Sequence, residues 1–323
     1  MEDVLPAPKP IAIEAIEAAR VRIAGTILRT PLVKLETVQG PEIYLKLETL
    51  QPINSFKLRG AANAVATLAP ERRKLGVWTI SAGNAGQGVA YAARAAGVPC
   101  TVVTIETAPA TKVERMRALG ARLVPASFDA CWEAMERRSF PGVEGTFVHP
   151  FDDDDFIAGN ATMGLEIVED LPQVETVITA IGGGGLIAGV ASGVRARKPG
   201  VRVYGAEPES AAPGAVSFSA GKASVFKAWQ ATFVDGAGGK SVFPRMWERM
   251  RLVADGSIVV SLDEVKRAMR VLAEKPRVIA EGAGALSVAA ALSGKAGDGP
   301  IVAVVSGGNI EISTFCELIS CAG

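Results

Sequence analysis

The sequence predicts an α/β protein whose strands form a mostly parallel sheet, with helices covering both of its faces. Two features of the 323 residues indicate this fold class. Short apolar runs rich in β-branched residues recur along the chain, and Ala-rich amphipathic stretches of helical length separate them. Such an alternation is typical of parallel sheets that are buried on both sides. The expected strands lie at 77–80, 101–105, 176–181, 201–204 and 301–305.

Hydrophobic periodicity predicts the helices. A stripe of Ile, Val and Ala indicates an N-terminal helix over 11–23. Ser261 and Glu264 have the spacing of a capping box, in which each side chain bonds a free amide of the first turn. Further helices are expected at 86–96, 111–119, 186–197 and 262–273.

One segment lacks a periodic pattern. Residues 213–244 contain seven glycines or prolines, which predicts a long surface connection near a functional site. The four aspartates at 152–155 have two interpretations, a metal site or a solvated helix start. We favour the helix start, because carboxylates at a helix N-terminus complement the helix dipole.

Composition excludes several classes of protein. Lys plus Arg and Asp plus Glu both number 34, so the net charge is zero and no basic excess indicates nucleic acid or an anionic membrane as partner. No run reaches the roughly 18 apolar residues of a membrane span, so we expect a cytoplasmic protein. The four cysteines have no metal-ligand spacing. The only histidine, His149, would have to be the base of any Ser-His-Asp mechanism.

A tetraglycine between an expected strand and an expected helix is the clearest ligand signal. Gly182, Gly183, Gly184 and Gly185, followed by Leu186, let the backbone approach an anion and direct amides at it. We interpret this loop as a phosphate site. The spacing of Gly183, Gly185 and Ala188, with Glu207 about 20 residues on, also fits a dinucleotide fingerprint. A nicotinamide-dependent oxidoreductase is therefore a remote alternative.

Two further loops carry polar groups directly after strands. The loop 81–88 offers amides at a helix start beside a hydroxyl and a carboxamide, which suits a carboxylate or, alternatively, a plain capped turn. The loop 306–309 places Ser306 at the end of an apolar strand. In an open parallel sheet, ligands bind beyond these carboxyl ends of the strands.

Lys57 is a candidate nucleophile. Lys57 and Arg59 fall in the first turn of a largely apolar helix, where cations oppose the helix dipole. A lysine desolvated there has a lowered pKa, which prepares its amine for Schiff-base chemistry. The other interpretation is a surface lysine whose amine reaches solvent. Local sequence leaves the two open.

Together these motifs resemble a known family. Residues 55–61 (Ser-Phe-Lys-Leu-Arg-Gly-Ala), 81–84 (Ser-Ala-Gly-Asn), 182–185 and 306–309 (Ser-Gly-Gly-Asn) look like the fold type II pyridoxal phosphate enzymes, the tryptophan synthase β-subunit family. The branch they resemble most comprises threonine/serine dehydratases and serine racemases. The resemblance implies two open twisted, mostly parallel sheets with the cofactor in the cleft between two domains. Residues 1–69 and 151–323 would form the large domain, and 70–150 the small domain that closes over the substrate.

The resemblance also implies a role for each motif residue. Lys57, beside Phe56, would hold pyridoxal 5'-phosphate as a Schiff base and later shuttle the Cα proton. Asn84 would bond the ring hydroxyl and Ser306 the pyridine nitrogen, while Glu281 would be either a cofactor-edge acid or a helix-start acid. The phosphate would lie on Gly182, Gly183, Gly184, Gly185 and Leu186, and the substrate on Ser81, Ala82, Gly83, Asn84 and Ala85.

The implied reaction is β-elimination from a β-hydroxy amino acid, which gives a 2-oxo acid and ammonia. The resemblance also implies that the enzyme is a homodimer. Serine and threonine are the default substrates, and Ala85, where many relatives have histidine, leaves room for an aryl serine or hydroxyaspartate. Racemases of the branch carry a serine where this chain has Ala82, so a dehydratase is preferred over a racemase. A β-replacement enzyme of the same fold stays an alternative. Relatives that bind a divalent cation have a second acid shortly after the glutamate that corresponds to Glu207, but this chain has Pro213 in that place. Whether a divalent cation binds therefore stays open.

Overall fold

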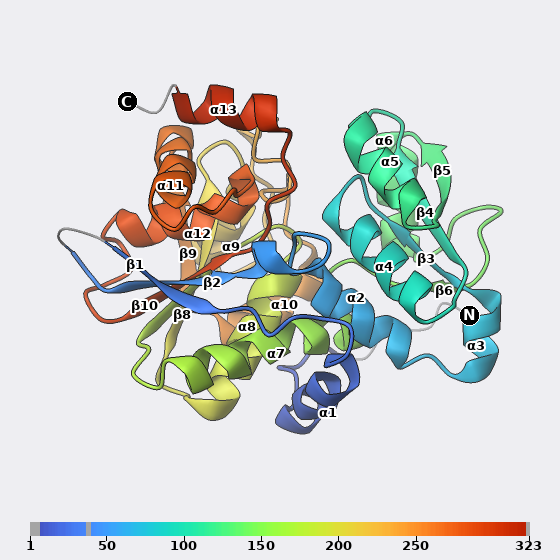
Figure 1. Cartoon of the computed structure of the whole chain (residues 1–323), viewed down its shortest axis with the longest axis horizontal. Helices are drawn as coiled ribbons and strands as arrows, with labels where there is room; N and C mark the ends of the chain where they lie inside the picture. Colours follow the sequence, from blue (N-terminus) through green and yellow to red (C-terminus); the bar gives the residue numbers. More distant parts are fainter. Residues whose placement is uncertain (1–6, 37–39, 321–323) are drawn as a thin grey trace.

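Two separate sheets form the framework of the protein. The computed structural model describes residues 7–36 and 40–320. In the larger sheet, the strand order is β1-β2-β10-β7-β8-β9 (Figure 1). Only β1 is antiparallel to its neighbour, and all other pairs are parallel. The strands are β1 (Leu32–Leu35), β2 (Ile43–Leu47), β10 (Ile301–Val305), β7 (Thr176–Ala180), β8 (Arg202–Pro208) and β9 (Gly256–Val260).

The smaller sheet is parallel throughout and has the order β5-β4-β3-β6. It occupies the right half of Figure 1 together with α4, α5 and α6. Its strands are β5 (Arg122–Ala126), β4 (Cys100–Ile105), β3 (Val77–Ile80) and β6 (Thr146–Phe147).

Thirteen α-helices of the described residues surround the sheets, and α2 lies between the two halves of the molecule (Figure 1). It packs against α4 on one side and α7 on the other. The helices are α1 (Ile13–Ile23), α2 (Lys57–Ala66), α3 (Pro70–Leu75), α4 (Asn84–Ala95), α5 (Ala110–Ala118), α6 (Phe128–Arg137), α7 (Asp154–Asp170), α8 (Gly185–Arg197), α9 (Pro213–Ala220), α10 (Pro244–Val253), α11 (Leu262–Glu274), α12 (Gly282–Leu292) and α13 (Ile312–Ser320), with one 3-10 turn at Glu48–Leu50. Among these helices, none combines the length and the apolar character that crossing a bilayer requires.

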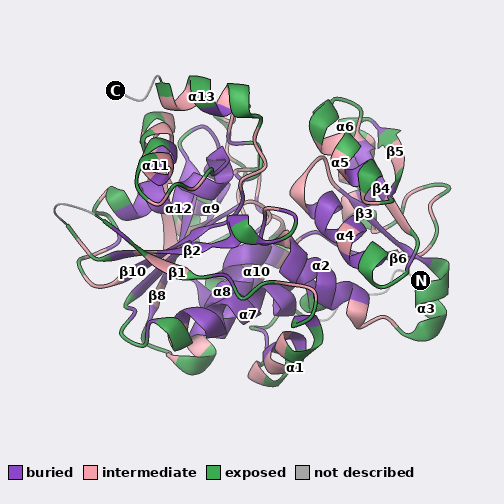
Figure 2. Cartoon of the chain, in the orientation of Figure 1, coloured by how far each residue is buried: buried purple, intermediate pink, exposed green. Residues whose placement is uncertain are grey.

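Both faces of the larger sheet are buried, as the sequence predicts. Along β10, Ala303 and Val305 pack into a cluster with α11 and α12, whereas Val302 and Val304 pack into a second cluster with α7 and α8. Alternate side chains of one strand therefore reach opposite apolar layers. Figure 2 shows the same layering, with buried strands inside and exposed residues on the outer helices. The predicted α/β class with two mostly parallel sheets is confirmed.

The segment 213–244 corrects one expectation, since it is not an unstructured connection throughout. Its first residues form α9, and Pro213 and Pro244 each lie in the first turn of a helix. Proline is favoured there because the amide it lacks would have no helical partner. The prolines that suggested loop structure are thus helix starts. The capping box of Ser261 and Glu264 forms as predicted.

The aspartate run begins α7 as favoured, with Asp154 and Asp155 exposed, but its first two residues are less solvated than expected. Asp153 caps the helix by accepting a hydrogen bond from the amide of Phe156 at 2.8 Å. Its burial raises the pKa of this carboxyl to about 6. Asp152 is buried between Arg138, at 2.7 Å, and Arg245, at 3.0 Å. Within 7–36 and 40–320, no cluster of His, Cys, Asp and Glu has a metal-binding arrangement.

Candidate active site

The predicted motif loops converge beside α2. Lys57 is the first residue of α2, and Phe56 precedes it with its amide bonded to the carbonyl of Ser306 at 3.0 Å. Ser55 forms a β-bridge with Gly307. The two motifs are far apart in the chain, yet they share backbone hydrogen bonds, so the end of β10 directly positions the lysine.

Lys57 has an apolar environment with one polar partner. Its Nζ donates to the carbonyl of Pro150 at 2.7 Å and lies 5.2 and 5.6 Å from the ring centres of Phe56 and Phe156. No carboxylate of the described residues forms an ion pair with it. Burial therefore lowers the pKa of the Lys57 amine to about 8. Of the two interpretations that the sequence left open, this geometry favours the desolvated lysine.

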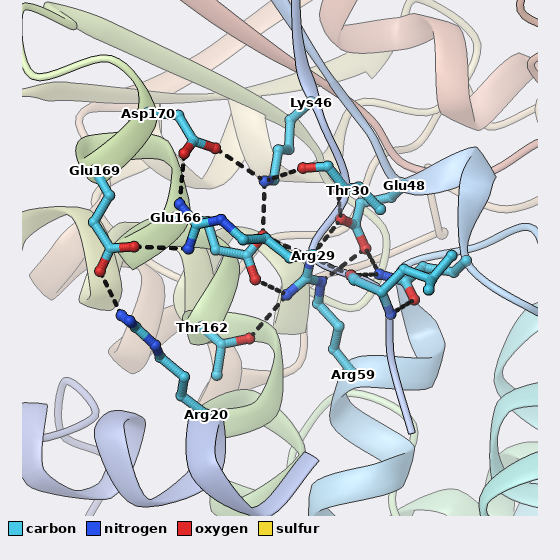
Figure 3. Close-up of polar contacts among 12 residues, drawn as sticks. Arg20, Arg29, Thr30, Lys46, Glu48, Arg59, Thr162, Glu166, Glu169 and Asp170 are labelled. Atoms are coloured by element: carbon cyan, nitrogen blue, oxygen red, sulfur yellow. Dashed lines mark hydrogen bonds and ion pairs between the residues drawn. The ribbon is translucent and has the colours of Figure 1, made fainter. Parts of the chain in front are cut away.

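Arg59, close to Lys57 on the same helix, is saturated with partners (Figure 3). Its guanidinium donates to both carboxylate oxygens of Glu48 at 2.8 Å and to those of Glu166 at 2.7 and 2.9 Å. Thr162 accepts a further bond at 3.2 Å. These carboxylates raise the pKa of Arg59 against the opposing effect of burial. The network explains why a cation is tolerated at this helix start.

The network extends from the core to the surface. Lys46, fully buried, lies 2.7 Å from Glu166 and donates to the carbonyl of Thr30 at 2.7 Å. Arg29 bonds Glu169 and Asp170 at the exposed end, as Figure 3 shows. The network thereby ties β2, α2 and α7 together.

The tetraglycine loop follows β7 and leads into α8, as predicted. Gly184 has a φ of +89°, which favours glycine. A Cβ on Gly183 would lie 2.3 Å from the ring of Phe151, and one on Gly185 would lie 2.8 Å from the Phe151 backbone. No oxygen of the described residues accepts a hydrogen bond from the amides of Gly182, Gly183 or Gly184. The loop therefore offers free amides without room for side chains.

Asn84 and Glu281 lie in direct contact. Asn84 starts α4 and donates from Nδ2 to Glu281 Oε1 at 2.6 Å, while Asn309 donates to Asn84 Oδ1 at 2.7 Å. The other oxygen of Glu281 is buried without a hydrogen-bond partner among the described residues. Burial, reinforced by the charge of Asp235, raises the pKa of Glu281 to about 7. Glu281 precedes α12 but does not bond that helix through its side chain.

The remaining predicted residues lie in the same region. Ser306 is buried, and its hydroxyl donates to the carbonyl of Ala283 at 3.4 Å. Ser81 accepts from the amide of Gly83 at 3.0 Å, which shapes the loop before α4. Ala82 is partly exposed and Ala85 is buried. Leu186 is buried in the first turn of α8.

Sequence analysis missed several groups around the site. A cavity of about 660 Å³ is lined by Gln87, Lys112, Asp235, Glu281 and Asn309, among others. Lys112 and Asp235 form an ion pair of 2.6 Å between α5 and the loop after α9. Gln87 is buried, and neither amide atom has a partner among the described residues. Gln87 and Asn309 stood within quoted motifs, but no sequence signal marked Lys112 or Asp235.

Glu207, the acid of the dinucleotide fingerprint, is already satisfied. Its carboxylate accepts from the amides of Gly214 and Ala215, at 2.8 and 2.7 Å, and from the Ser257 hydroxyl at 2.7 Å. It thus holds the start of α9. This arrangement leaves the oxidoreductase alternative without the acid that would bind a ribose.

Comparison with known proteins identifies one family model and several related enzymes. A family model described as pyridoxal-phosphate dependent enzyme matches residues 23–307. L-threonine ammonia-lyase of Thermotoga maritima is 40% identical over 316 residues, which cover 96% of this chain and 78% of that protein. Catabolic L-threonine dehydratase of Staphylococcus aureus is 36% identical over 319 residues, covering 96% and 92%.

Solved structures show the same likeness. Maize serine racemase superimposes with a TM-score of 0.88 at 31% identity, covering 97% of this chain and 98% of that one. The processed form of threonine deaminase isoform 2 from Solanum lycopersicum gives a TM-score of 0.84 at 30% identity, covering 100% and 98%.

Proposed function

Because the chain belongs to the family of pyridoxal-phosphate dependent enzymes, we propose that it is an ammonia-lyase that acts on a β-hydroxy amino acid. Threonine and serine are the first substrates to consider, since relatives at 36 and 40% identity are named as threonine dehydratase and ammonia-lyase. The products are a 2-oxo acid and ammonia. The observation of the structure that best supports pyridoxal phosphate chemistry is the Lys57 amine, which lies beside the rings of Phe56 and Phe156 with one carbonyl acceptor and has its pKa lowered by burial to about 8.

The residues present fit pyridoxal phosphate. A Schiff base needs a neutral amine, and the surroundings of Lys57 favour that form. A phosphate needs several amides and close backbone approach, and the loop at Gly182, Gly183 and Gly184 offers both. We assign the cofactor to Lys57, Phe56, Asn84, Ser306 and residues 182–186, and the substrate carboxylate to residues 81–85.

The protein's contribution is to position groups and move a proton. Bound pyridoxal phosphate supplies the electron sink for the carbanion at Cα. Lys57 takes the Cα proton, for which a pKa near the working pH is suited. Ser306 presents a hydroxyl, which cannot hold a ring nitrogen protonated as a carboxylate would, so elimination of the β-hydroxyl is favoured. Free amides before and in the first turn of α4 suit the substrate carboxylate.

A racemase is the second candidate, since serine racemase is among the similar structures. Racemisation by two bases requires an acid on the face of Cα opposite the lysine. Ala82 occupies the place in the motif where racemases of the branch carry a serine, and its methyl group cannot donate a proton. This difference favours the lyase.

We further propose that residues 70–150 move as a small domain that closes over the substrate. The proposal is supported by the smaller sheet, whose strands all fall between residues 77 and 147. A homodimer, which rests on the family resemblance, and a cytoplasmic location are also part of the proposal. Gel filtration with light scattering tests the dimer.

One experiment tests the reaction directly. The purified protein is supplied with pyridoxal phosphate and L-threonine, and 2-oxo acid release is followed alongside chiral analysis of the remaining amino acid. We expect 2-oxo acid, no D-allothreonine (the product of inversion at Cα of L-threonine), and a borohydride-reduced adduct mapping to Lys57. Racemised substrate without 2-oxo acid would overturn the lyase, and serine consumed only with added sulfide would indicate β-replacement.

A further inference from the structure

His149, the only histidine of the chain, lies in the segment that connects β6 to α7. It is 2% exposed, so it takes no part in surface chemistry. Its Nδ1 accepts two backbone hydrogen bonds, from the amide of Phe151 at 3.3 Å and from that of Asp152 at 3.0 Å. The imidazole thus closes a turn over residues 149–152, as an Asn or Asp side chain does in an Asx-turn.

The protonation state of His149 follows from these donors. A ring nitrogen that accepts amide protons carries a free lone pair, so the proton of the neutral ring lies on Nε2. Burial lowers the pKa of His149 well below its usual value, and the charges of Arg138, Lys57 and Arg245 lower it further. His149 is therefore an acceptor rather than a proton-transfer group at neutral pH.

The turn that His149 closes touches both halves of the proposed cofactor site. Pro150 presents its carbonyl to Lys57 Nζ at 2.7 Å. The next residue, Phe151, lies with its ring against Gly183 and its backbone against Gly185, where added Cβ atoms would meet them at 2.3 and 2.8 Å. Two consecutive residues therefore contact the lysine and the glycine loop.

Ring contacts hold the imidazole in place. His149 packs edge-on against Phe151, with ring centres 4.5 Å apart, and against Phe147 at 5.5 Å. Phe147 belongs to β6 of the smaller sheet. The position of the turn is thus set by both its hydrogen bonds and its neighbours.

We propose that His149 is a positioning residue for cofactor binding, because its Nδ1 fixes the turn that sets the Lys57 amine relative to the tetraglycine loop. This inference rests on the proposed function. It assigns the residue a role in affinity for pyridoxal phosphate, separate from any role in proton transfer.

Three variants at one position test this role. H149L removes the acceptor, H149N keeps an oxygen at the right distance for an Asx-turn, and H149Q carries the same amide one methylene too far. The apoprotein of each is titrated with pyridoxal phosphate to obtain Kd, and the melting temperature of the apoprotein is measured in parallel. We expect H149L and H149Q to weaken binding at least about tenfold, as loss of two hydrogen bonds allows. H149N should stay within about threefold of the wild type.

The outcomes separate the inference from the proposed function. Failure of the wild type to bind pyridoxal phosphate at Lys57 contradicts the proposed function itself. A wild type that binds, with H149L of equal affinity, overturns only the role of His149, even if H149L melts at a lower temperature. If H149L does not fold, the comparison of H149N with H149Q decides, and equal affinities of that pair overturn the inference.

Discussion

Two cations of α2, Lys57 and Arg59, are close neighbours in the chain and have opposite electrostatic environments. Lys57 has one carbonyl acceptor and aromatic neighbours, and burial lowers its pKa to about 8. Arg59 is fully buried, more so than the half-buried Lys57, but Glu48 and Glu166 bind it through all of its guanidinium nitrogens and raise its pKa. Burial alone therefore does not determine whether a cation is reactive.

The difference lies in the compensating carboxylates. A buried charge without a counterion shifts toward its neutral form, whereas a paired charge stays ionised and becomes structural. Arg59 and its two glutamates join α2 to the 3-10 turn at Glu48–Leu50 and to α7. This network fixes the helix whose first residue is Lys57, and leaves the lysine itself uncompensated and available for chemistry.

Replacement of Lys57 should have the largest effect. K57A and K57R should both lower 2-oxo acid release from threonine by roughly a thousandfold or more, since neither can form the imine nor transfer the proton as the amine does. K57R is the sharper variant, because it keeps the charge and changes only the chemistry. Steady-state assays of both proteins, with circular dichroism as a control for folding, make the measurement. Activity retained in K57R would mean that charge alone is required.

Removal of the compensated cation should chiefly affect stability. R59M takes from Glu48 and Glu166 the guanidinium that they share, and we expect it to lower the free energy of unfolding by about 3–5 kcal/mol. The matched control is R137M, which breaks an exposed pair with Glu133 and should cost less than about 0.5 kcal/mol. Urea denaturation compares the two. An equally small loss in R59M would contradict the structural role of the network.

Sequence reasoning predicted the fold class and the motif loops because each leaves a local pattern. β10 is apolar throughout, β7 consists of apolar residues and buried threonines, and the tetraglycine follows β7 after one residue, Ile181. The strands β1 and β5 escaped it because most of their residues are partly buried or exposed. Arg59 was recognised as misplaced, but its partners lie 11 and 107 residues away, a distance that no local pattern spans. The Pro150 carbonyl carries no side-chain signal at all.

The lowered pKa of Lys57 allows a direct test of the difference between an uncompensated and a paired cation. Only the neutral amine is nucleophilic, so reactivity rises as the pH increases through the pKa. In the apoprotein, labelling of Lys57 by acetic anhydride should be half-maximal near pH 8. At that pH its neutral fraction exceeds that of an ordinary lysine by roughly a hundredfold. Lys34 is the internal control, since its hydrogen bond to Glu42 raises its pKa. Mass spectrometry of digested protein reads both sites, and equal midpoints would contradict the desolvated amine.

Two carboxylates extend the same comparison. Glu166, paired with Arg59 and Lys46, has a lowered pKa, whereas Glu281, with a single amide donor, has its pKa raised by burial to about 7. A carboxyl whose pKa is higher in the folded than in the unfolded protein stabilises the fold at low pH. That stabilisation is lost as the pH rises from about 4.5 to about 7.

E281Q should remove this pH dependence while keeping an oxygen for Asn84. Relative to E281Q, we expect the wild type to lose about 2–3 kcal/mol of unfolding free energy across that interval. Urea denaturation at several pH values measures the difference. E248Q, at a half-exposed position of α10, serves as the control and should follow the wild type. Parallel pH profiles for wild type and E281Q would mean that Glu281 is ionised in the folded protein, and that a counterion compensates it as Arg59 compensates Glu166.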